Sequence, residues 1–329
     1  MLSVRLDAPC KINLHLRVKE RRPDGCHDLE SVFLALALGD TLHVELRDAG
    51  QADEFVTEDR RSQPSGGEEI PGPDNIVLKA AALFRAKTGF DRGLRIRLEK
   101  RVPLGAGLGG GSSDGAAALA ALNGLAEQAG HPRLLGGTGL RAAAAELGSD
   151  VPFFLDLLTA GGVAGGAAWV TGRGEHIRPV EGPPDCAVLL ANPGFPSNTA
   201  EAYRLLDLRR AGEGLGYGSG TGLSAQSLIA ALRGPPARWP YGNDFLEIFL
   251  GGNGAQAAAY RSILEGLRSG GADFCGLTGS GSTCFGIFAE KRAAEKAAEA
   301  LQNGRHTPES GIFTVLTFPL AHLGKRVLL

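Results

Sequence analysis

The sequence lacks several patterns that mark whole classes of protein. Its five cysteines are scattered and include no Cys-x-x-Cys pair, so neither a zinc ribbon nor a redox dithiol is supported. No run of about 18 uninterrupted apolar residues is present, so we expect no membrane span. Residues 1–14 lack the basic start and long apolar run of a secretion signal. We therefore expect a cytoplasmic protein with reduced cysteines.

A large excess of one charge is also missing. The 34 Lys and Arg residues are balanced by 36 Asp and Glu residues, for a formal net charge of −2. Because nucleic-acid binders usually carry a basic excess, we expect no nucleic-acid partner, and we expect no membrane partner either. With 329 residues and 43% hydrophobic side chains, the chain is long enough for two packed domains.

Strand and helix patterns mix along the whole chain. Ile12, Leu14 and Leu16 alternate with polar residues, as in a half-buried strand. Asp74 is the expected N-cap of the first helix. Patterns of these kinds predict strands over 3–19, 29–38, 42–46, 94–101, 186–191 and 312–318, and helices over 74–87, 115–129, 139–147, 200–210, 224–232, 244–250, 255–268 and 291–301.

The predicted fold class is α+β with two domains. The polar segment 48–73 is expected to be a long exposed loop, and the low-complexity segment 211–222 to be mobile. The glycine-rich segment 161–174 is expected to be a hinge. It would separate an N-terminal domain, residues 1–160, from a C-terminal domain, residues 161–329.

Glycine is strongly over-represented, with 49 of 329 positions, and is densest just ahead of a predicted helix. Glycine lets the backbone approach a ligand closely, and the first amides of a helix have no partner within it. The segment therefore predicts a phosphate site, although a flexible loop with an ordinary serine N-cap is the alternative. The cluster comprises Gly105, Gly107, Gly109, Gly110 and Gly111, followed by Ser112 and Ser113.

The glycine loop does not identify its phosphate ligand by itself. Gly105-x-Gly107-x-x-Gly110 matches the GxGxxG pattern of dinucleotide-binding folds, which also need an acidic residue about 20 positions later. Glu127 is near that spacing but lies late in a helical run. The GxxxxGK[ST] pattern of a P-loop is absent. A nicotinamide-dependent oxidoreductase therefore stays open as an alternative.

The segment from Pro103 to Ser113 resembles the central motif of the GHMP kinase superfamily, Pro-x-Gly-x-Gly-Leu-Gly-(Gly)-Ser-Ser. Further motifs follow the order seen in one branch, the 4-diphosphocytidyl-2-C-methyl-D-erythritol kinases, and run from residue 8 to about residue 288. They are Ala8-Pro-Cys-Lys11-Ile-Asn13-Leu, Arg22-Pro-Asp24-Gly25-Cys-His27, Asp74-Asn75-Ile, Gly148-Ser-Asp150-Val-Pro152-Phe, Asn243-Asp244 and Gly279-Ser-Gly281-Ser-Thr283.

The resemblance implies a kinase with its active site in the cleft between two domains. ATP would phosphorylate the 2-hydroxyl of 4-diphosphocytidyl-2-C-methyl-D-erythritol, in the methylerythritol phosphate route to isoprenoid precursors. Lys11 and Asp150 would be catalytic, and Asn13, His27 and Tyr203 would contact the substrate. The residues implied around ATP are Asn75, Ile76, Lys100, Pro103, Gly105, Gly107, Leu108, Gly109, Gly110, Gly111, Ser112 and Ser113.

The resemblance also implies a cofactor and a partner. Mg²⁺ is expected with the ATP phosphates, with Ser113 at the matching position and no acidic ligand assigned. The partner is a small cytidine diphosphate derivative, and the chain could be a monomer or a homodimer.

The residue types of the implied catalytic pair suit phosphoryl transfer to an alcohol. The acceptor hydroxyl must be oriented and lose its proton, and the transferring negative charge must be stabilised. Asp150, at a turn before Pro152, would accept the proton, and Lys11 would keep that carboxylate ionised. Each also has an ordinary explanation: Lys11 as a cation at a strand edge, and Asp150 as a helix N-cap.

The cytidine end departs from the family pattern. Cys26 stands where the family commonly has Tyr, which removes a stacking surface worth about 1–3 kcal/mol per base. Tyr203 matches a second aromatic position and could stack, or could be a helix residue packed on the core. His27 could read the polar edge of the base, or be merely solvated. Gly279–Thr283 could hold the substrate diphosphate at the far side of the cleft, or be a simple tight turn.

Two further alternatives remain. Another GHMP kinase could act on a sugar, homoserine or mevalonate. A catalytically inactive binding protein is disfavoured because Lys11 and Asp150 are both present.

Overall fold

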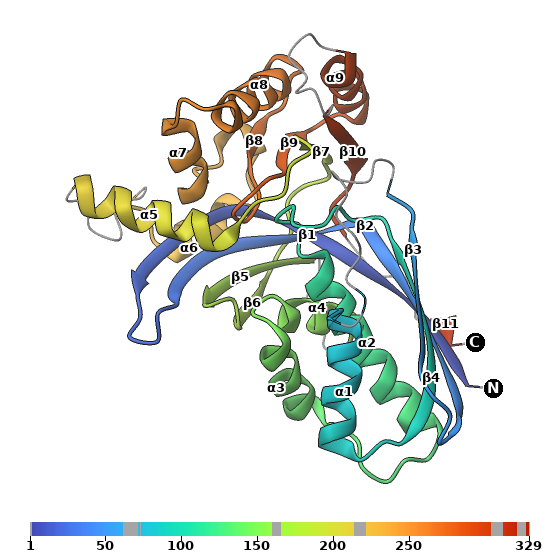
Figure 1. The fold of residues 1–329 in the computed structure, drawn as a ribbon. Coiled ribbons are helices and arrows are strands. Elements are labelled where there is room, and N and C mark those ends of the chain that lie inside the picture. The colour runs from blue at the N-terminus through green and yellow to red at the C-terminus, as the bar shows by residue number, and fades with distance from the viewer. Residues whose placement is uncertain are drawn as a thin grey trace.

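The computed structural model describes residues 2–61, 72, 74–159, 166–213, 222–303, 312–320 and 327–328. Helices and strands mix throughout, in two sheets, which confirms the predicted α+β class (Figure 1). The larger sheet has the order β11-β1-β2-β4-β3, with β5 paired to β2 and β6 paired to β5. Its strands are β1 (Ser3–Arg21), β2 (His27–Ala49), β3 (Glu54–Asp59), β4 (Arg92–Lys100), β5 (Ala167–Gly172), β6 (His176–Val180) and β11 (Val327–Leu328).

The smaller sheet has the order β10-β7-β9-β8. Its strands are β7 (Ala187–Asn192), β8 (Phe274–Leu277), β9 (Cys284–Phe288) and β10 (Phe313–Thr317). Within the described residues, no helix is both long enough and apolar enough to cross a membrane.

Helices cover the two sheets in separate groups (Figure 1). The group on the larger sheet is α1 (Ile76–Thr88), α2 (Gly110–Gln128), α3 (Gly137–Leu147) and α4 (Val151–Leu158). The helices that follow β7 are α5 (Thr199–Glu213), α6 (Ala225–Ala231), α7 (Asp244–Gly251), α8 (Ala255–Ser269) and α9 (Lys291–Asn303).

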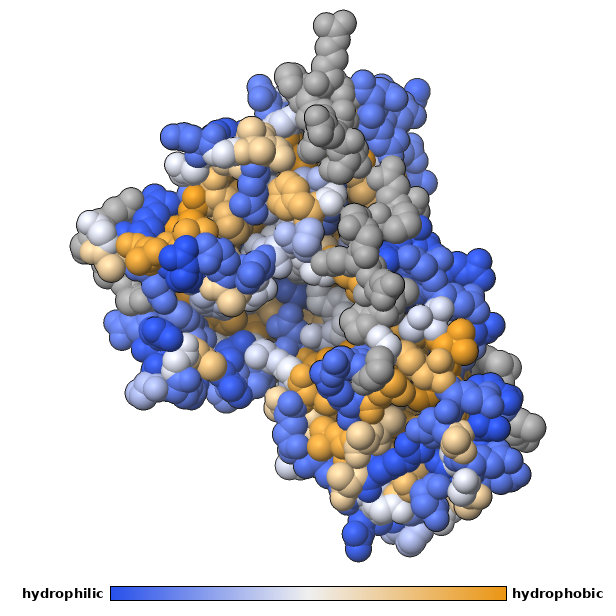
Figure 2. Space-filling view, in the orientation of Figure 1, coloured by the Kyte–Doolittle hydropathy of each residue, from blue (hydrophilic) through white to orange (hydrophobic). Residues whose placement is uncertain are grey.

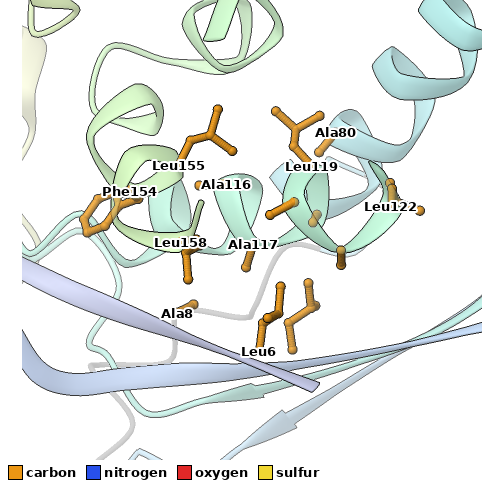
Figure 3. Packing of buried hydrophobic residues seen from close by; sticks show 14 of the residues in the cluster. Leu6, Ala8, Ala80, Ala116, Ala117, Leu119, Leu122, Phe154, Leu155 and Leu158 are labelled. Carbon is orange, nitrogen blue, oxygen red and sulfur yellow. The ribbon is translucent and has the colours of Figure 1, made fainter. Parts of the chain in front are cut away.

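The first hydrophobic core lies between the larger sheet and its helices. Figure 3 shows Leu6 and Ala8 of β1 below Ala117 of α2 and Leu158 of α4. The alanine-rich α2 is buried along most of its length, because small side chains let it approach its neighbours closely.

A second apolar cluster joins the two sheets. Ile12 and Leu14 of β1 and Leu34 of β2 belong to the same buried cluster as Val188 of β7 and Phe285 of β9. Burial of this apolar surface favours one arrangement of the two sheets. The loops at the ends of the two sheets are therefore held in contact with each other. The candidate site is built from such loops.

The predicted strands 29–38 and 42–46 are parts of one strand, β2. Gly39 and Asp40, which interrupt the apolar pattern, pair with Pro9 and Ala8 of β1. A strand continues through such an interruption because its ladder is made of backbone hydrogen bonds.

The predicted loop 48–73 contains a strand, β3, which pairs in parallel with β4. Its side chains are exposed or half-buried, so it lacks the apolar alternation that reveals a strand in sequence. Residues 62–71 and 73 of this segment lie outside the described residues.

The predicted hinge 161–174 includes a strand of the larger sheet. Residues 167–172 form β5, paired with β2, while residues 160–165 lie outside the described residues. The domain boundary at residues 160 and 161 stays a prediction, and the pairing of β5 and β6 favours a boundary after Val180. Of the predicted mobile segment 211–222, α5 includes residues 211–213, and 214–221 are not described.

Two helix starts differ from the prediction. The N-cap of α1 is Asn75 rather than Asp74, because the Asn75 carboxamide oxygen accepts a hydrogen bond from the Val77 amide at 2.9 Å. Helix α2 begins at Gly110 rather than at residue 115. At Gly110 a Cβ would lie 2.9 Å from the Val102 side chain, so close packing at this helix start favours glycine despite its poor helix propensity.

Candidate active site

A cavity of about 430 Å³ lies where α1 and α2 begin. Every residue predicted to surround ATP lines it except Ser113, whose side chain is fully buried. Asp74, Leu104, Ala106 and Asp114 complete its wall. On the face shown in Figure 2, the molecule is hollowed between the part that carries α7–α9 and the part that carries α1–α4.

The glycine loop has the conformation that glycine permits and other residues resist. Gly105, Gly107 and Gly109 have φ values of 57°, 75° and 71°. Gly109 is the N-cap of α2, so the amides of the first turn of the helix lie at the cavity wall. These amides and the helix dipole make the loop a site for an anion such as phosphate.

A second loop, Thr278–Thr283, packs directly against the glycine loop. The Thr278 hydroxyl donates to the Gly107 carbonyl at 3.0 Å, and the Thr283 amide donates to the Ala106 carbonyl at 3.2 Å. We expected this turn at the far side of the cleft. The geometry places it instead as a support for the loop predicted to hold the ATP phosphates.

Lys11 and Asp150 lie together beside the glycine loop. The Lys11 Nζ is 3.5 Å from Asp150 Oδ2, and the Lys11 amide donates to the Leu108 carbonyl at 2.9 Å. The Lys11 ammonium also lies over the Phe33 ring, 4.7 Å from its centroid. The structure thus brings together two residues that are far apart in the sequence.

The ordinary explanations for this pair fit the structure poorly. Lys11 is not an exposed cation at a strand edge, because its side chain is only 5% exposed and its backbone amide is bonded to the Leu108 carbonyl of the glycine loop. Asp150 occupies the N-cap position of α4, but its side chain makes no capping hydrogen bond there. Its carboxylate, 27% exposed, can therefore accept a proton from a bound alcohol.

Asn13 lies inside the protein rather than at an open surface. Its Oδ1 accepts hydrogen bonds from Lys11 Nζ at 2.6 Å and from the Gly279 amide at 2.9 Å. Its Nδ2 donates to the Ser31 hydroxyl at 2.9 Å. The predicted substrate contact of Asn13 stays a prediction, and its observed contacts tie Lys11 to the second loop.

His27 and Tyr203 stack on each other. Their ring centroids are 5.0 Å apart with an interplanar angle of 19°, and His27 Nε2 lies 2.9 Å from Asp207 Oδ1. Tyr203 also meets Phe245 edge-on, at 4.9 Å. Cys26, beside His27, is exposed.

Tyr203 also lies within electrostatic reach of Asp150. Burial, with smaller contributions from Asp150 and Cys26, raises the pKa of the Tyr203 phenol to about 12. The predicted contacts of His27 and Tyr203 with cytosine stay predictions.

Comparisons with known proteins agree with this geometry. The family models for the GHMP kinase N-terminal domain and C-terminal domain match residues 75–156 and 242–306. The 4-diphosphocytidyl-2-C-methyl-D-erythritol kinase of Anaeromyxobacter sp. (strain K) is 38% identical over 314 residues, covering 94% of this chain and 88% of that protein. The enzyme of the same name from Xanthomonas axonopodis pv. citri is 35% identical, covering 90% and 86%.

The chain belongs to the GHMP kinase family. Within that family, the relatives that it resembles at 35–38% identity are 4-diphosphocytidyl-2-C-methyl-D-erythritol kinases. A crystal structure of 4-(cytidine 5'-diphospho)-2C-methyl-D-erythritol kinase matches with a TM-score of 0.69 at 31% identity, covering 96% of this chain and 99% of that one.

A more distant likeness shows the fold alone. The mevalonate kinase of L. major is 15% identical, with a TM-score of 0.65 and 96% of each chain covered. As a GHMP kinase the chain uses ATP, so the alternatives of a nicotinamide-dependent oxidoreductase and an inactive binding protein are wrong. The Gly105–Gly110 pattern is that of the kinase loop.

The structure also adds residues around the kinase site that the sequence did not single out. Asp40 and Asp114 both contact Lys100 beneath the glycine loop, and Thr278 contacts both Gly107 and Asn13. A signal was present only for Asp114, which directly follows the two serines of the loop motif. The partners of Asp40 and Thr278 are 60 and 171 residues away, so no local pattern shows them.

Proposed function

We propose that this kinase transfers the γ-phosphate of ATP to the 2-hydroxyl of 4-diphosphocytidyl-2-C-methyl-D-erythritol. The observation that carries this proposal is the Lys11–Asp150 pair, which lies beside a glycine loop suited to the ATP phosphates. The product belongs to the methylerythritol phosphate route to isoprenoid precursors. We place the reaction in the cytoplasm, and a monomer or a homodimer stays open.

The transfer forms a bond between the substrate oxygen and the γ-phosphorus and breaks the bond to the ADP oxygen. The hydroxyl proton passes to the Asp150 carboxylate as the oxygen attacks. Lys11, whose ammonium lies 3.5 Å from the Asp150 carboxylate, offsets negative charge that develops nearby. The amides at the start of α2 hold the phosphates in place.

Mg²⁺ fits this site as an ion carried by ATP. Within the described residues, no group of three or more His, Cys, Asp and Glu is placed to hold a metal ion alone. A nucleotide-bound Mg²⁺ needs only one or two protein ligands, since phosphates and water supply the rest. Ser112 lines the cavity and could supply a hydroxyl, whereas the Ser113 hydroxyl is buried without a hydrogen-bond partner. When bound, Mg²⁺ would neutralise phosphate charge.

The proposal is tested by comparing acceptor alcohols. ATP consumption is measured with the cytidine diphosphate methylerythritol substrate, mevalonate, homoserine and a sugar. We expect phosphorylation of the cytidine derivative alone. Turnover of homoserine or mevalonate at a comparable kcat/KM would instead favour another GHMP small-molecule kinase.

We predict that His27→Ala weakens binding of CDP and leaves the affinity for an ATP analogue within about twofold. The loss of a polar partner for the base costs about 1 kcal/mol or more. The ring also stacks on Tyr203 and lies 2.9 Å from Asp207, so its removal would loosen that wall of the site. Calorimetric titration of CDP and of the non-hydrolysable analogue measures both. Weaker binding of the ATP analogue with unchanged CDP affinity would contradict the placement of His27 at the cytidine.

Cys26→Tyr is the companion experiment. Because Cys26 is exposed, the variant protein is expected to fold, and its tyrosine ring is expected to offer the base a stacking surface. We expect CDP binding to tighten by up to about 1–3 kcal/mol. Unchanged CDP affinity in a folded variant would mean that position 26 does not face the base.

A further inference from the structure

A buried ion cluster lies directly beneath the glycine loop. Lys100 Nζ contacts Asp40 Oδ2 and donates to Asp114 Oδ2 at 2.7 Å. The three side chains are 2%, 0% and 3% exposed. The resemblance had implied that Lys100 lies among the residues around ATP. Although Lys100 lines the cavity, its ammonium is already engaged by two carboxylates.

The cluster contacts the chain on both sides of the loop. Asp40 Oδ1 accepts hydrogen bonds from the Arg101 amide at 2.5 Å and the Val102 amide at 2.9 Å, at the point where the chain leaves β4 for the loop. Asp114 lies in α2, just after the loop ends. One ammonium therefore connects the segment that enters the loop to the helix that receives it.

Burial and the neighbouring charges act in opposite directions on the pKa values of Asp114 and Lys100. Burial raises the pKa of the Asp114 carboxyl, against the opposing effect of Lys100. Burial alone would lower the pKa of Lys100, but Asp114 and Asp40 hold it above its usual value. Lys100 is thus a fixed cation at the end of β4, and it bonds to groups on two other elements, β2 and α2.

Stability alone does not require such a cluster. Replacing a buried ion cluster with groups of similar volume that carry no charge is often neutral or stabilising, whereas removing one partner is strongly destabilising. An ion cluster does, however, impose a defined geometry on the segments that it joins. The segments joined here are the two ends of the loop predicted to hold the ATP phosphates.

We infer that Asp40, Lys100 and Asp114 are positioning residues that set the separation of the two ends of the glycine loop, and through it the affinity for ATP. This inference rests on the proposed function, in which that loop holds the ATP phosphates. The cluster acts through the backbone of residues 101–102 and the start of α2. It leaves the cytidine end of the site unaffected.

Two variants test this inference. Lys100→Met removes the cation but leaves two carboxylates buried, which could prevent folding. The triple variant Asp40→Asn, Lys100→Met and Asp114→Asn carries no charge there and keeps side-chain acceptors at positions 40 and 114. The matched control is Lys87→Met, which removes an ion pair with Glu146 between α1 and α3, away from the loop.

Three measurements separate positioning from general loosening. The affinities for a non-hydrolysable ATP analogue and for CDP are determined by calorimetry. Hydrogen exchange of residues 103–112 is followed without nucleotide, and thermal unfolding is recorded for each protein. In both cluster variants we expect the Kd of the ATP analogue to rise about 10- to 100-fold, with faster exchange in the loop. We expect CDP affinity within about twofold of wild type, and no change in the control.

A folded triple variant that binds the ATP analogue like wild type would overturn the inference. So would equal losses of affinity for the analogue and for CDP, which would mean general loosening. The proposed function fails in a different way. A wild-type protein that binds CDP but no ATP analogue would contradict the proposed function, whereas loop exchange would still report on the cluster.

Discussion

Asp150→Asn is expected to abolish turnover while leaving the fold and the binding of both ligands nearly intact. The amide keeps the size of the side chain but cannot accept the hydroxyl proton, and general-base catalysis contributes about 100- to 10,000-fold to the rate. Because the Asp150 side chain makes no capping hydrogen bond in α4, the substitution removes no hydrogen bond of the helix N-cap. Steady-state kinetics with the cytidine substrate, and calorimetry with CDP and an ATP analogue, measure the effect.

Lys11 should act together with Asp150. Lys11→Ala is also expected to lower kcat strongly, since the ammonium lies 3.5 Å from the carboxylate. The double variant should lose less than the sum of the two single losses, because groups that act as a unit are not additive. Turnover of Asp150→Asn within about tenfold of wild type would exclude the proton-acceptor role.

Gly107→Val is expected to abolish ATP binding and to destabilise the protein. A Cβ at Gly107 would clash with the carbonyl oxygen of Thr278 and lie 2.8 Å from that of Gly281. The φ of Gly107, +75°, is also one that a β-branched residue resists. The obstacle to a side chain at position 107 is therefore the second loop, Thr278–Thr283.

The expected size of this effect is large because two unfavourable terms combine. The left-handed backbone costs a non-glycine residue about 1–2 kcal/mol, and relief of the clash needs the two loops to separate. Thermal unfolding and calorimetry with an ATP analogue and CDP measure it. Gly124→Ala is the matched control, since a Cβ there meets nothing within 4 Å and the residue lies in α2. Unchanged ATP affinity and melting temperature in Gly107→Val would contradict the packing of the two loops.

Local patterns were sufficient for much of the fold. The strand at the N-terminus, the helix α8 and the strand β7 were predicted close to their observed bounds, because each has a regular apolar period and a clear end. The strand β3 and the start of α2 were not predicted. The strand β3 is an exposed edge strand, and the first turn of α2 is rich in glycine. Only pairing with β4 and packing against Val102 determine those two segments.

The sequence by itself determined the class of fold and the kinase family, and it predicted most of the residues that line the candidate site, because each motif is a short run of neighbouring residues. It also singled out Lys11 and Asp150, whose approach to 3.5 Å depends on the fold. The tertiary structure alone decided which groups each side chain meets. Lys100 is held by two carboxylates, and His27 is stacked on Tyr203. Such contacts join residues far apart in the chain, and the energy that selects them comes from burial and electrostatics in three dimensions.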